Sequence, residues 1–226
     1  MNELLFILYS FFILTGSVFF LKKGLIWITS WLSILIILMN FFVNKQISLF
    51  SLNITAADPL SVGYLFGLNL IREFYSSKEA QNIAKITLII SMFLPLICFM
   101  HLSLIPNSFD YTQIHFSKII APSYRIIAAS ILTFFIVQFI DLKIFSLLKQ
   151  LLKRKFFVSR SLVVLIISQF IDTFLFSFLA LYGQVSNIFH IILMSLLAKI
   201  FASLISIPVT LYLKKMSLHQ IQKNSS

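Results

Sequence analysis

Apolar residues run along the chain in long stretches separated by short polar connections. The stretches predict membrane-spanning helices at residues 4–21, 25–43, 59–75, 84–105, 119–147, 161–183 and 187–213. An α-helix needs about 20 mostly apolar residues to cross a bilayer, and the stretch at 59–75 has the weakest apolar pattern. We therefore expect an all-α polytopic membrane helix bundle of six to seven transmembrane helices. Residues 1–226 would form a single integral membrane domain.

The composition supports the same class. Of the 226 residues, 59% are hydrophobic and only 11% are charged. Soluble domains contain about 25% charged residues, and disordered chains have few apolar ones. The composition therefore excludes both a soluble globular protein and a disordered chain.

Basic residues outnumber acidic ones by 18 to 7, which gives a formal net charge of +11. In a soluble chain, this excess would suggest a nucleic-acid partner. If all seven stretches cross the membrane, however, the connections on one side carry Lys22, Lys23, Lys78, Lys149, Lys153, Arg154, Lys155, Arg160, Lys214, Lys215 and Lys223, and those on the other carry only Lys45 and Lys118. Because basic connections stay in the cytoplasm, we expect an outside N-terminus and a cytoplasmic C-terminus. The expected partner is the lipid bilayer, with no nucleic acid.

Motifs of familiar enzyme and metal sites are missing from the sequence. Cys98 is the single cysteine, and His101, His115, His190 and His219 show neither HxxxH nor HExxH spacing. The sequence contains no Gly-rich phosphate loop and no GxSxG motif. We therefore expect no metal, no cofactor and no enzymatic activity.

Two charged residues fall deep inside predicted spans. Asp172 is eleven residues into the stretch 161–183, and Lys199 is fourteen residues from the end of 187–213. At 1.5 Å per residue these depths are about 16 and about 21 Å, so the two side chains can meet on neighbouring helices. Such residues cost about 2.5 to 3.5 kcal/mol at the centre of a membrane helix. A buried ion pair would lower that cost without any ligand, whereas for Asp172 we favour a functional role.

Asp172 belongs to a polar stripe on an otherwise apolar helix. Its members follow the spacing i, i+3, i+4 and i+7, which places Gln169, Asp172, Thr173 and Phe176 on one face. Carboxylate and amide groups suit the polar edge of a planar, purine-like heterocycle. Phe170 and Phe176 are the candidate rings to stack on it.

The Gln169-Phe-Ile-Asp172 segment repeats Gln138-Phe-Ile-Asp141 of the preceding stretch, which crosses the membrane in the opposite direction. Weak internal symmetry often accompanies transporters with a site near the bilayer midplane. We therefore expect two Gln-x-x-Asp faces that face each other.

A further polar group lies in the weakest stretch. Asn69 and Glu73 share a helix face, whereas Arg72 and Glu73 are adjacent and do not. We therefore expect Arg72 and Glu73 each to find another partner or to extend to the cytoplasmic interface.

Ala198 and Ala202 bracket Lys199 with small-xxx-small spacing. Such a surface allows helices to approach closely. It suits packing within the chain or in a homo-oligomer.

The segment Leu68–Ala80, the two Gln-x-x-Asp motifs, Thr173, Phe176, and Lys199 with Pro208 downstream together resemble the queuosine precursor transporter family, also called the vitamin-uptake-transporter-like family. The resemblance covers most of residues 55–213. It implies a bacterial inner-membrane carrier that imports a 7-deazaguanine, such as preQ0, preQ1 or queuine, for the queuosine modification of tRNA.

The family pattern Glu-x-Tyr-Gly is matched by Glu73 and Tyr75, but Ser76 replaces the usual Gly and Asn69 stands where Asp is common. The positions of Asp172, Thr173 and Lys199 match well. The resemblance implies that Asp172 accepts hydrogen bonds from the guanine-like edge and that Lys199 balances the charge or engages the ligand. It also implies that Gln169 and Gln138 orient the ring, with Asp141 as a second acceptor or a gate.

Other functions fit parts of the same pattern. A substrate-binding subunit of an energy-coupling-factor vitamin importer is also a small helix bundle with small-residue surfaces. An intramembrane aspartyl hydrolase would use Asp141 and Asp172 as paired acid and base, but neither has a Gly-x-Gly-Asp context. A structural assembly subunit would leave the midplane charges unexplained.

Overall fold

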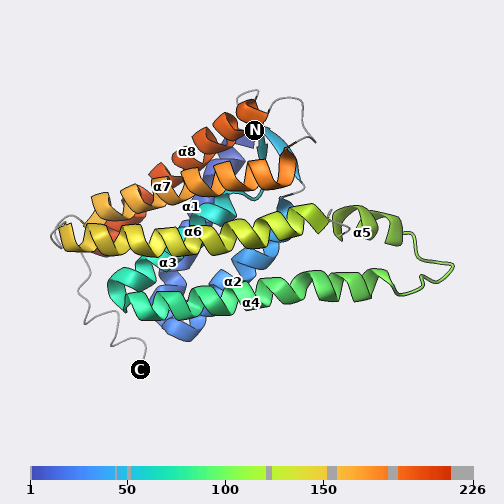
Figure 1. Ribbon diagram of the computed structural model, residues 1–226, viewed down its shortest axis with the longest axis horizontal. Coiled ribbons are helices and arrows are strands. Elements are labelled where there is room, and N and C mark those ends of the chain that lie inside the picture. The colour runs from blue at the N-terminus through green and yellow to red at the C-terminus, as the bar shows by residue number, and fades with distance from the viewer. Residues whose placement is uncertain are drawn as a thin grey trace.

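The computed structural model describes residues 2–43, 45–49, 52–120, 124–151, 157–182 and 188–214. Its elements are α1 (Asn2–Lys23), α2 (Leu25–Phe42), β1 (Gln46–Leu49), β2 (Leu52–Thr55), α3 (Asp58–Phe74), α4 (Ser77–Leu102), α5 (Gln113–Ile120), α6 (Tyr124–Leu151), α7 (Phe157–Phe176) and α8 (Ile188–Lys214). One π-helical turn, Ser177–Leu181, extends α7. Figure 1 shows the long helices lying side by side as an elongated bundle.

Five helices in the described part of the chain are long and apolar enough to cross a membrane. They are Asn2–Lys23, Leu25–Phe42, Ser77–Leu102, Ala128–Leu148 and Leu162–Ala180, and α8 adds a shorter apolar stretch, Ser195–Val209. Large apolar side chains cover the outside of the bundle, as lipid contact requires. The predicted fold class, an all-α polytopic membrane bundle, is confirmed.

Helix α3 lies at the centre of this bundle. Nearly all of its 17 residues are buried, and α1, α2, α4, α7 and α8 pack around it. It is the helix with the weakest apolar pattern in the sequence. Because α3 contacts protein rather than lipid, polar residues on it can find partners inside the chain.

Two glycines allow this close packing. Gly63 and Gly67 lie one helical turn apart on α3, with Gly63 against Ile13 of α1 and Gly67 against Leu32 of α2. A Cβ atom at Gly67 would lie only 2.6 Å from Leu32 Cδ2. The Gly-xxx-Gly face lets the backbones approach where a larger residue would hold them apart.

A short hairpin leads into α3 and was not among the predicted elements. Strands β1 and β2 pair antiparallel, with Gln46 opposite Thr55 and Leu49 opposite Leu52. Only four residues form each strand, which is too short for a clear alternating pattern. The hairpin places Thr55 beside the first turn of α3.

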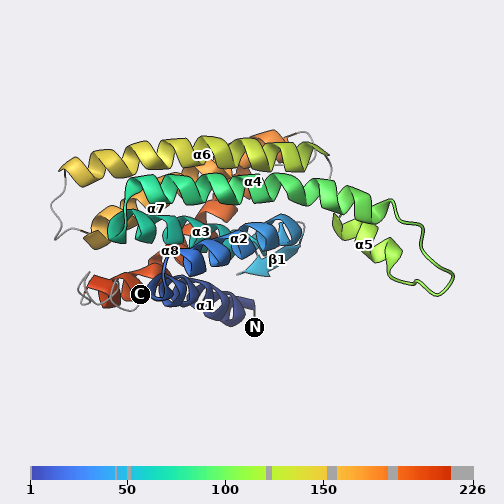
Figure 2. The same ribbon diagram turned by 90° about the horizontal axis from the view of Figure 1, so that it is seen from below.

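The predicted span 119–147 is wrong at its start. The chain forms the short helix α5 and then the separate helix α6, which begins at Tyr124. Figure 2 shows α5 and the loop before it extending beyond the bundle. In that loop, Thr112 donates hydrogen bonds to Asp110 from its hydroxyl and its backbone N–H, and these lower the pKa of the Asp110 carboxyl.

Successive long helices run in opposite directions (Figures 1 and 2). The C-terminal ends of α1, α6 and α8 therefore lie at the same end of the bundle as the start of α4. Lys22, Lys23 and Lys78 belong to this end. Ser76 caps α4 there by accepting a hydrogen bond from the backbone N–H of Glu79.

Candidate functional site

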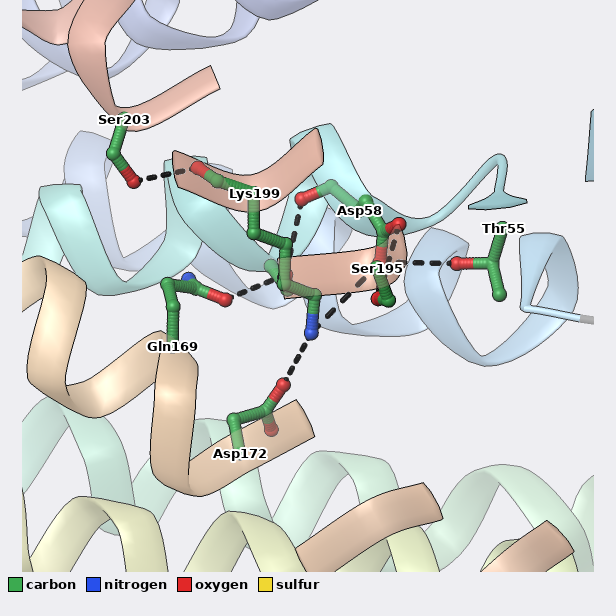
Figure 3. Close-up of polar contacts among 8 residues, drawn as sticks. Thr55, Asp58, Gln169, Asp172, Ser195, Lys199 and Ser203 are labelled. Carbon is green, nitrogen blue, oxygen red and sulfur yellow. Dashed lines mark hydrogen bonds and ion pairs between the residues drawn. The ribbon is translucent and has the colours of Figure 1, made fainter. Parts of the chain in front are cut away.

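Lys199 joins three helices at the middle of the bundle. Its Nζ lies 2.6 Å from Oδ2 of Asp172 on α7 and 3.8 Å from Oδ1 of Asp58 on α3. Figure 3 shows the ammonium between the two carboxylates. We call these three residues the lysine–aspartate triad. The expected proximity of Lys199 and Asp172 is thus observed, and a second carboxylate shares the lysine.

Sequence reasoning missed Asp58. The residue lies in the first turn of α3, next to Pro59, and its side chain is 4% exposed. Asp58 immediately precedes the predicted stretch 59–75, in a connection where a charge needs no partner. An Asp-Pro pair is a typical helix start, but only the packing of α3 inside the bundle makes this carboxylate a buried one.

Hydroxyl groups hold the Asp58 carboxylate in place (Figure 3). Thr55 Oγ1 donates to its Oδ1 over 3.2 Å, and Ser195 Oγ lies 3.3 and 3.4 Å from its two oxygens. Hydrogen bonds from hydroxyls stabilise the ionised form of a carboxylate. The triad and the two hydroxyls that bond Asp58 therefore bring residues of β2, α3, α7 and α8 to one place.

The polar stripe of α7 faces this triad. Gln169 is fully buried, and its Oε1 accepts a hydrogen bond from Ser61 of α3 over 3.4 Å. In Figure 3 a dashed line from the Gln169 amide oxygen marks this hydrogen bond. Within the described chain, Gln169 Nε2 and the buried Thr173 hydroxyl have no hydrogen-bond partner. Buried polar groups without partners are rare in folded proteins.

A second ionic contact lies further along α3. Arg72 is fully buried, and its Nη1 donates to Oδ2 of Asp141 on α6 and, over 2.9 Å, to Oδ1 of Asn69. Ser168 of α7 donates to the other oxygen of Asp141. We call Arg72 and Asp141 the arginine pair. Of the two alternatives for Arg72, another partner or the cytoplasmic interface, the structure shows the first, because α3 is enclosed by other helices and Asp141 supplies an internal partner.

The two Gln-x-x-Asp motifs have parallel roles in the structure. Each aspartate pairs with a cation from another helix, Asp141 with Arg72 and Asp172 with Lys199. Gln138, like Gln169, is buried, and neither of its amide atoms has a partner among the described residues. The repeated motif therefore gives two buried ion pairs, each accompanied by a glutamine with free hydrogen-bonding capacity.

Not every predicted residue joins these groups. Phe170 is 53% exposed and stacks on Phe174 along the outside of α7, so its prediction as a ligand-stacking ring is wrong. Phe176 and Glu73 are half-buried. Phe170 points outward because it follows Gln169 directly, and adjacent helical residues lie about 100° apart.

The structure describes one of the two alanines that bracket Lys199. Ala198 is buried against the core of the chain, so it is used within the chain. The Ala202 side chain lies outside the described residues.

The triad and the arginine pair together form a polar line along α3. Asp58 and Arg72 are fourteen residues apart, which corresponds to about 21 Å along the helix. Asp172, Gln169 and Ser168 of α7 bridge the two ends of this line. Among the described residues, no three His, Cys, Asp or Glu side chains form a metal-binding group.

A sequence model of the family described as "Putative vitamin uptake transporter" matches residues 60–213, more than half of the chain. The match contains α3 from Leu60 onward and almost all of α8, and hence most of both polar groups. Helices α1 and α2 precede it. Searches of curated proteins and of solved structures gave no match.

Proposed function

Since the chain belongs to the vitamin uptake transporter family, we propose that it imports a queuosine precursor, a 7-deazaguanine such as preQ0, preQ1 or queuine, for tRNA modification. The family and the apolar helices establish a multi-pass membrane protein of a transporter family. The choice of a deazaguanine rests on the resemblance of its motifs and on the chemistry of the buried polar groups.

One observation carries this proposal. Gln138, Gln169 and Thr173 are buried with polar atoms that have no partner in the described chain, and they lie on the two helices that carry the paired aspartates. A buried polar group without a partner costs about 1–3 kcal/mol. A planar ring with donors and acceptors along its edge can satisfy such amides and hydroxyls together.

In this proposal, Asp172 receives the donor edge of the ring. Its side chain is 25% exposed, and Lys199 contacts only its Oδ2. Gln169 and Gln138 orient the ring from α7 and α6, and Thr173 adds a hydroxyl. The positive charge of Lys199 offsets part of the negative charge of the carboxylates in the site.

In this proposal the arginine pair holds the helices together at the other end of the polar line along α3 from Asp58. Asp141 joins α6 to α3 through Arg72 and to α7 through Ser168. A buried ion pair between helices can hold one arrangement of a bundle and release it when its partners separate. Asn69 supports Arg72, and Glu73, at the same end of α3, belongs to this side of the site.

The same contacts argue against an aspartyl hydrolase. A paired acid and base must share a reacting site, but Asp141 and Asp172 are each engaged by a different cation on a different helix. The proposal therefore includes no catalytic residue. It places the protein in the bacterial inner membrane with its basic connections and its C-terminus in the cytoplasm.

The test is uptake in a bacterium that lacks its own deazaguanine synthesis and carrier but has the salvage enzymes. Cells expressing the chain receive limiting preQ0, preQ1 or queuine, and queuosine in tRNA is measured. We expect the unmodified chain to restore queuosine, and Asp172→Asn and Gln138→Leu to lose most of it at equal membrane expression. Thr15→Val is the matched control, because the Thr15 hydroxyl bonds only the carbonyls of its own helix in the described structure.

Absence of queuosine with all three compounds, from a correctly inserted protein, would overturn the deazaguanine proposal. Uptake that appears only when an energy-coupling ATPase module is supplied would identify the chain as a substrate-binding subunit instead.

A further inference from the structure

The buried charges of the bundle do not balance. In the described chain, Asp58, Asp141 and Lys199 are buried with Arg72, and Asp172 is mostly buried. The arginine pair is neutral, whereas two carboxylates share the single ammonium of Lys199. The triad therefore has one carboxylate more than it has cations.

An extra negative charge inside a membrane protein is costly unless a positive charge approaches it. The two carboxylates of the triad are not equivalent. Lys199 lies 2.6 Å from Asp172 but 3.8 Å from Asp58, so Asp58 is the less completely paired of the two. The hydroxyls of Thr55 and Ser195 keep hydrogen bonds to it.

Unused polar atoms next to the triad indicate a ligand rather than a purely structural charge. Gln169 Nε2 and Thr173 Oγ1 have no partner in the described residues, and both side chains are at least 98% buried. Gln169 lies one helical turn before Asp172 on α7, and Thr173 follows Asp172 directly. A ligand that contacts these two side chains would therefore lie beside Asp172 of the triad.

From this geometry we propose that the triad binds a positively charged amine on the transported molecule, with Asp58 as the residue that selects it. The inference rests on the proposed function and narrows its substrate class to planar heterocycles that carry an ammonium group. Among the deazaguanines, the 7-aminomethyl compound and its amine-substituted derivatives are cations at neutral pH. The 7-cyano compound is neutral.

The ammonium would take the place of the long Lys199 contact on Asp58, while Lys199 stays on Asp172. This exchange brings the triad from a net charge of −1 to zero without moving a buried charge into contact with lipid. A nitrile offers no such compensation. The neutral compound would therefore bind with the charge imbalance still present.

The test is competition for uptake into proteoliposomes that contain the purified full chain. Labelled 7-aminomethyl-7-deazaguanine is supplied, and its unlabelled form and the 7-cyano compound are compared as competitors. We expect the amine to compete at least tenfold better than the nitrile. Asp58→Asn should reduce this preference to nearly one by weakening competition by the amine, with little effect on the nitrile.

Ser195→Ala provides a milder second variant that keeps the Asp58 charge and removes one hydroxyl from it. It should keep the preference for the amine, with weaker binding. Equal competition by the two compounds in the unmodified protein would overturn the inference while leaving the proposed function intact. An equal loss for both compounds in Asp58→Asn would also overturn it, because Asp58 would then act on the fold rather than on the amine.

If the unmodified protein transports neither of these labelled compounds nor labelled queuine, the proposed function itself fails. The labelled 7-cyano compound is therefore run in parallel, so that a transporter of neutral deazaguanines is distinguished from a protein that transports none.

Discussion

Lys199 and Asp172 form an ion pair between α8 and α7, with Nζ 2.6 Å from Oδ2. The pair joins the last two long helices of the bundle. Because Asp58 lies 3.8 Å from the same ammonium, the lysine has a second partner, and the effects of changing each residue differ.

Removing the lysine should therefore harm the fold more than removing Asp172. In Asp172→Asn, Lys199 keeps Asp58, so we expect a loss of about 1 kcal/mol in the free energy of unfolding. Lys199→Met leaves two buried carboxylates without a cation, for which we expect a loss of about 3–5 kcal/mol. Thermal or denaturant unfolding of the detergent-purified proteins measures both. Equal losses would mean that Asp58 does not support Lys199.

The arginine pair should behave as a coupled pair. Arg72→Met or Asp141→Leu alone leaves one buried charge unpaired, and each should lower stability by about 3–5 kcal/mol. The double variant leaves no unpaired charge and should recover a large part of this loss. A double-mutant cycle on unfolding free energies gives the coupling. Additive effects would show that the two charges do not interact.

The glycine face of α3 should tolerate no added methyl group. Gly63→Ala and Gly67→Ala place a Cβ against Ile13 and Leu32, and we expect each to reduce stability by about 1–3 kcal/mol through overpacking. Ser30→Ala on the exposed side of α2 is the control, since its hydroxyl bonds its own helix in the described structure. Unchanged melting temperatures for both glycine variants would contradict the close approach of α3 to α1 and α2.

Thr173 should affect ligand binding and stability in opposite directions. Thr173→Val keeps the side-chain shape and removes a buried hydroxyl that has no partner in the described chain, so stability should stay constant or rise. Ligand affinity should fall by roughly tenfold, the effect of losing one hydrogen bond of about 1.4 kcal/mol. Binding to purified protein and melting temperature, measured together, test this. If Thr173→Val lowers both the ligand affinity and the melting temperature, the Thr173 hydroxyl stabilises the fold rather than binding the ligand.

The orientation of the bundle can be tested by cysteine labelling. In a Cys98→Ser background, Tyr111→Cys lies in the exposed loop before α5, and Lys23→Cys lies at the end of α1. With the basic connections in the cytoplasm, a membrane-impermeant thiol reagent added to intact cells should label position 111 and not position 23. Permeabilised cells serve as the control for reactivity. The reverse pattern would invert the proposed topology.

The elements predicted from the sequence agree with the structure in some parts of the chain and not in others. Apolar stretches such as 4–21 and 187–213 predicted helices within a few residues of α1 and α8, because length and hydropathy alone decide whether a helix can lie in lipid. The paired strands β1 and β2 and the separate helices α5 and α6 were missed, because short strands and helix ends inside apolar runs leave little periodic signal. The repeated Gln-x-x-Asp motif predicted two faces that face each other, whereas in the structure Asp141 pairs with Arg72 and Asp172 with Lys199.

The sequence by itself determined the membrane class, the polar stripe of α7 and the depth at which Asp172 and Lys199 meet, since these follow from helix geometry and from the cost of charge in lipid. Only the tertiary structure decided the partners. It enclosed α3, turned Arg72 inward to Asp141, and brought Asp58 from a loop-like position to Lys199. The partner of a buried charge depends on which helices are neighbours. Contacts between distant parts of the chain decide this, such as those of the glycine face of α3 with α1 and α2. A local sequence pattern does not predict which helices make such contacts.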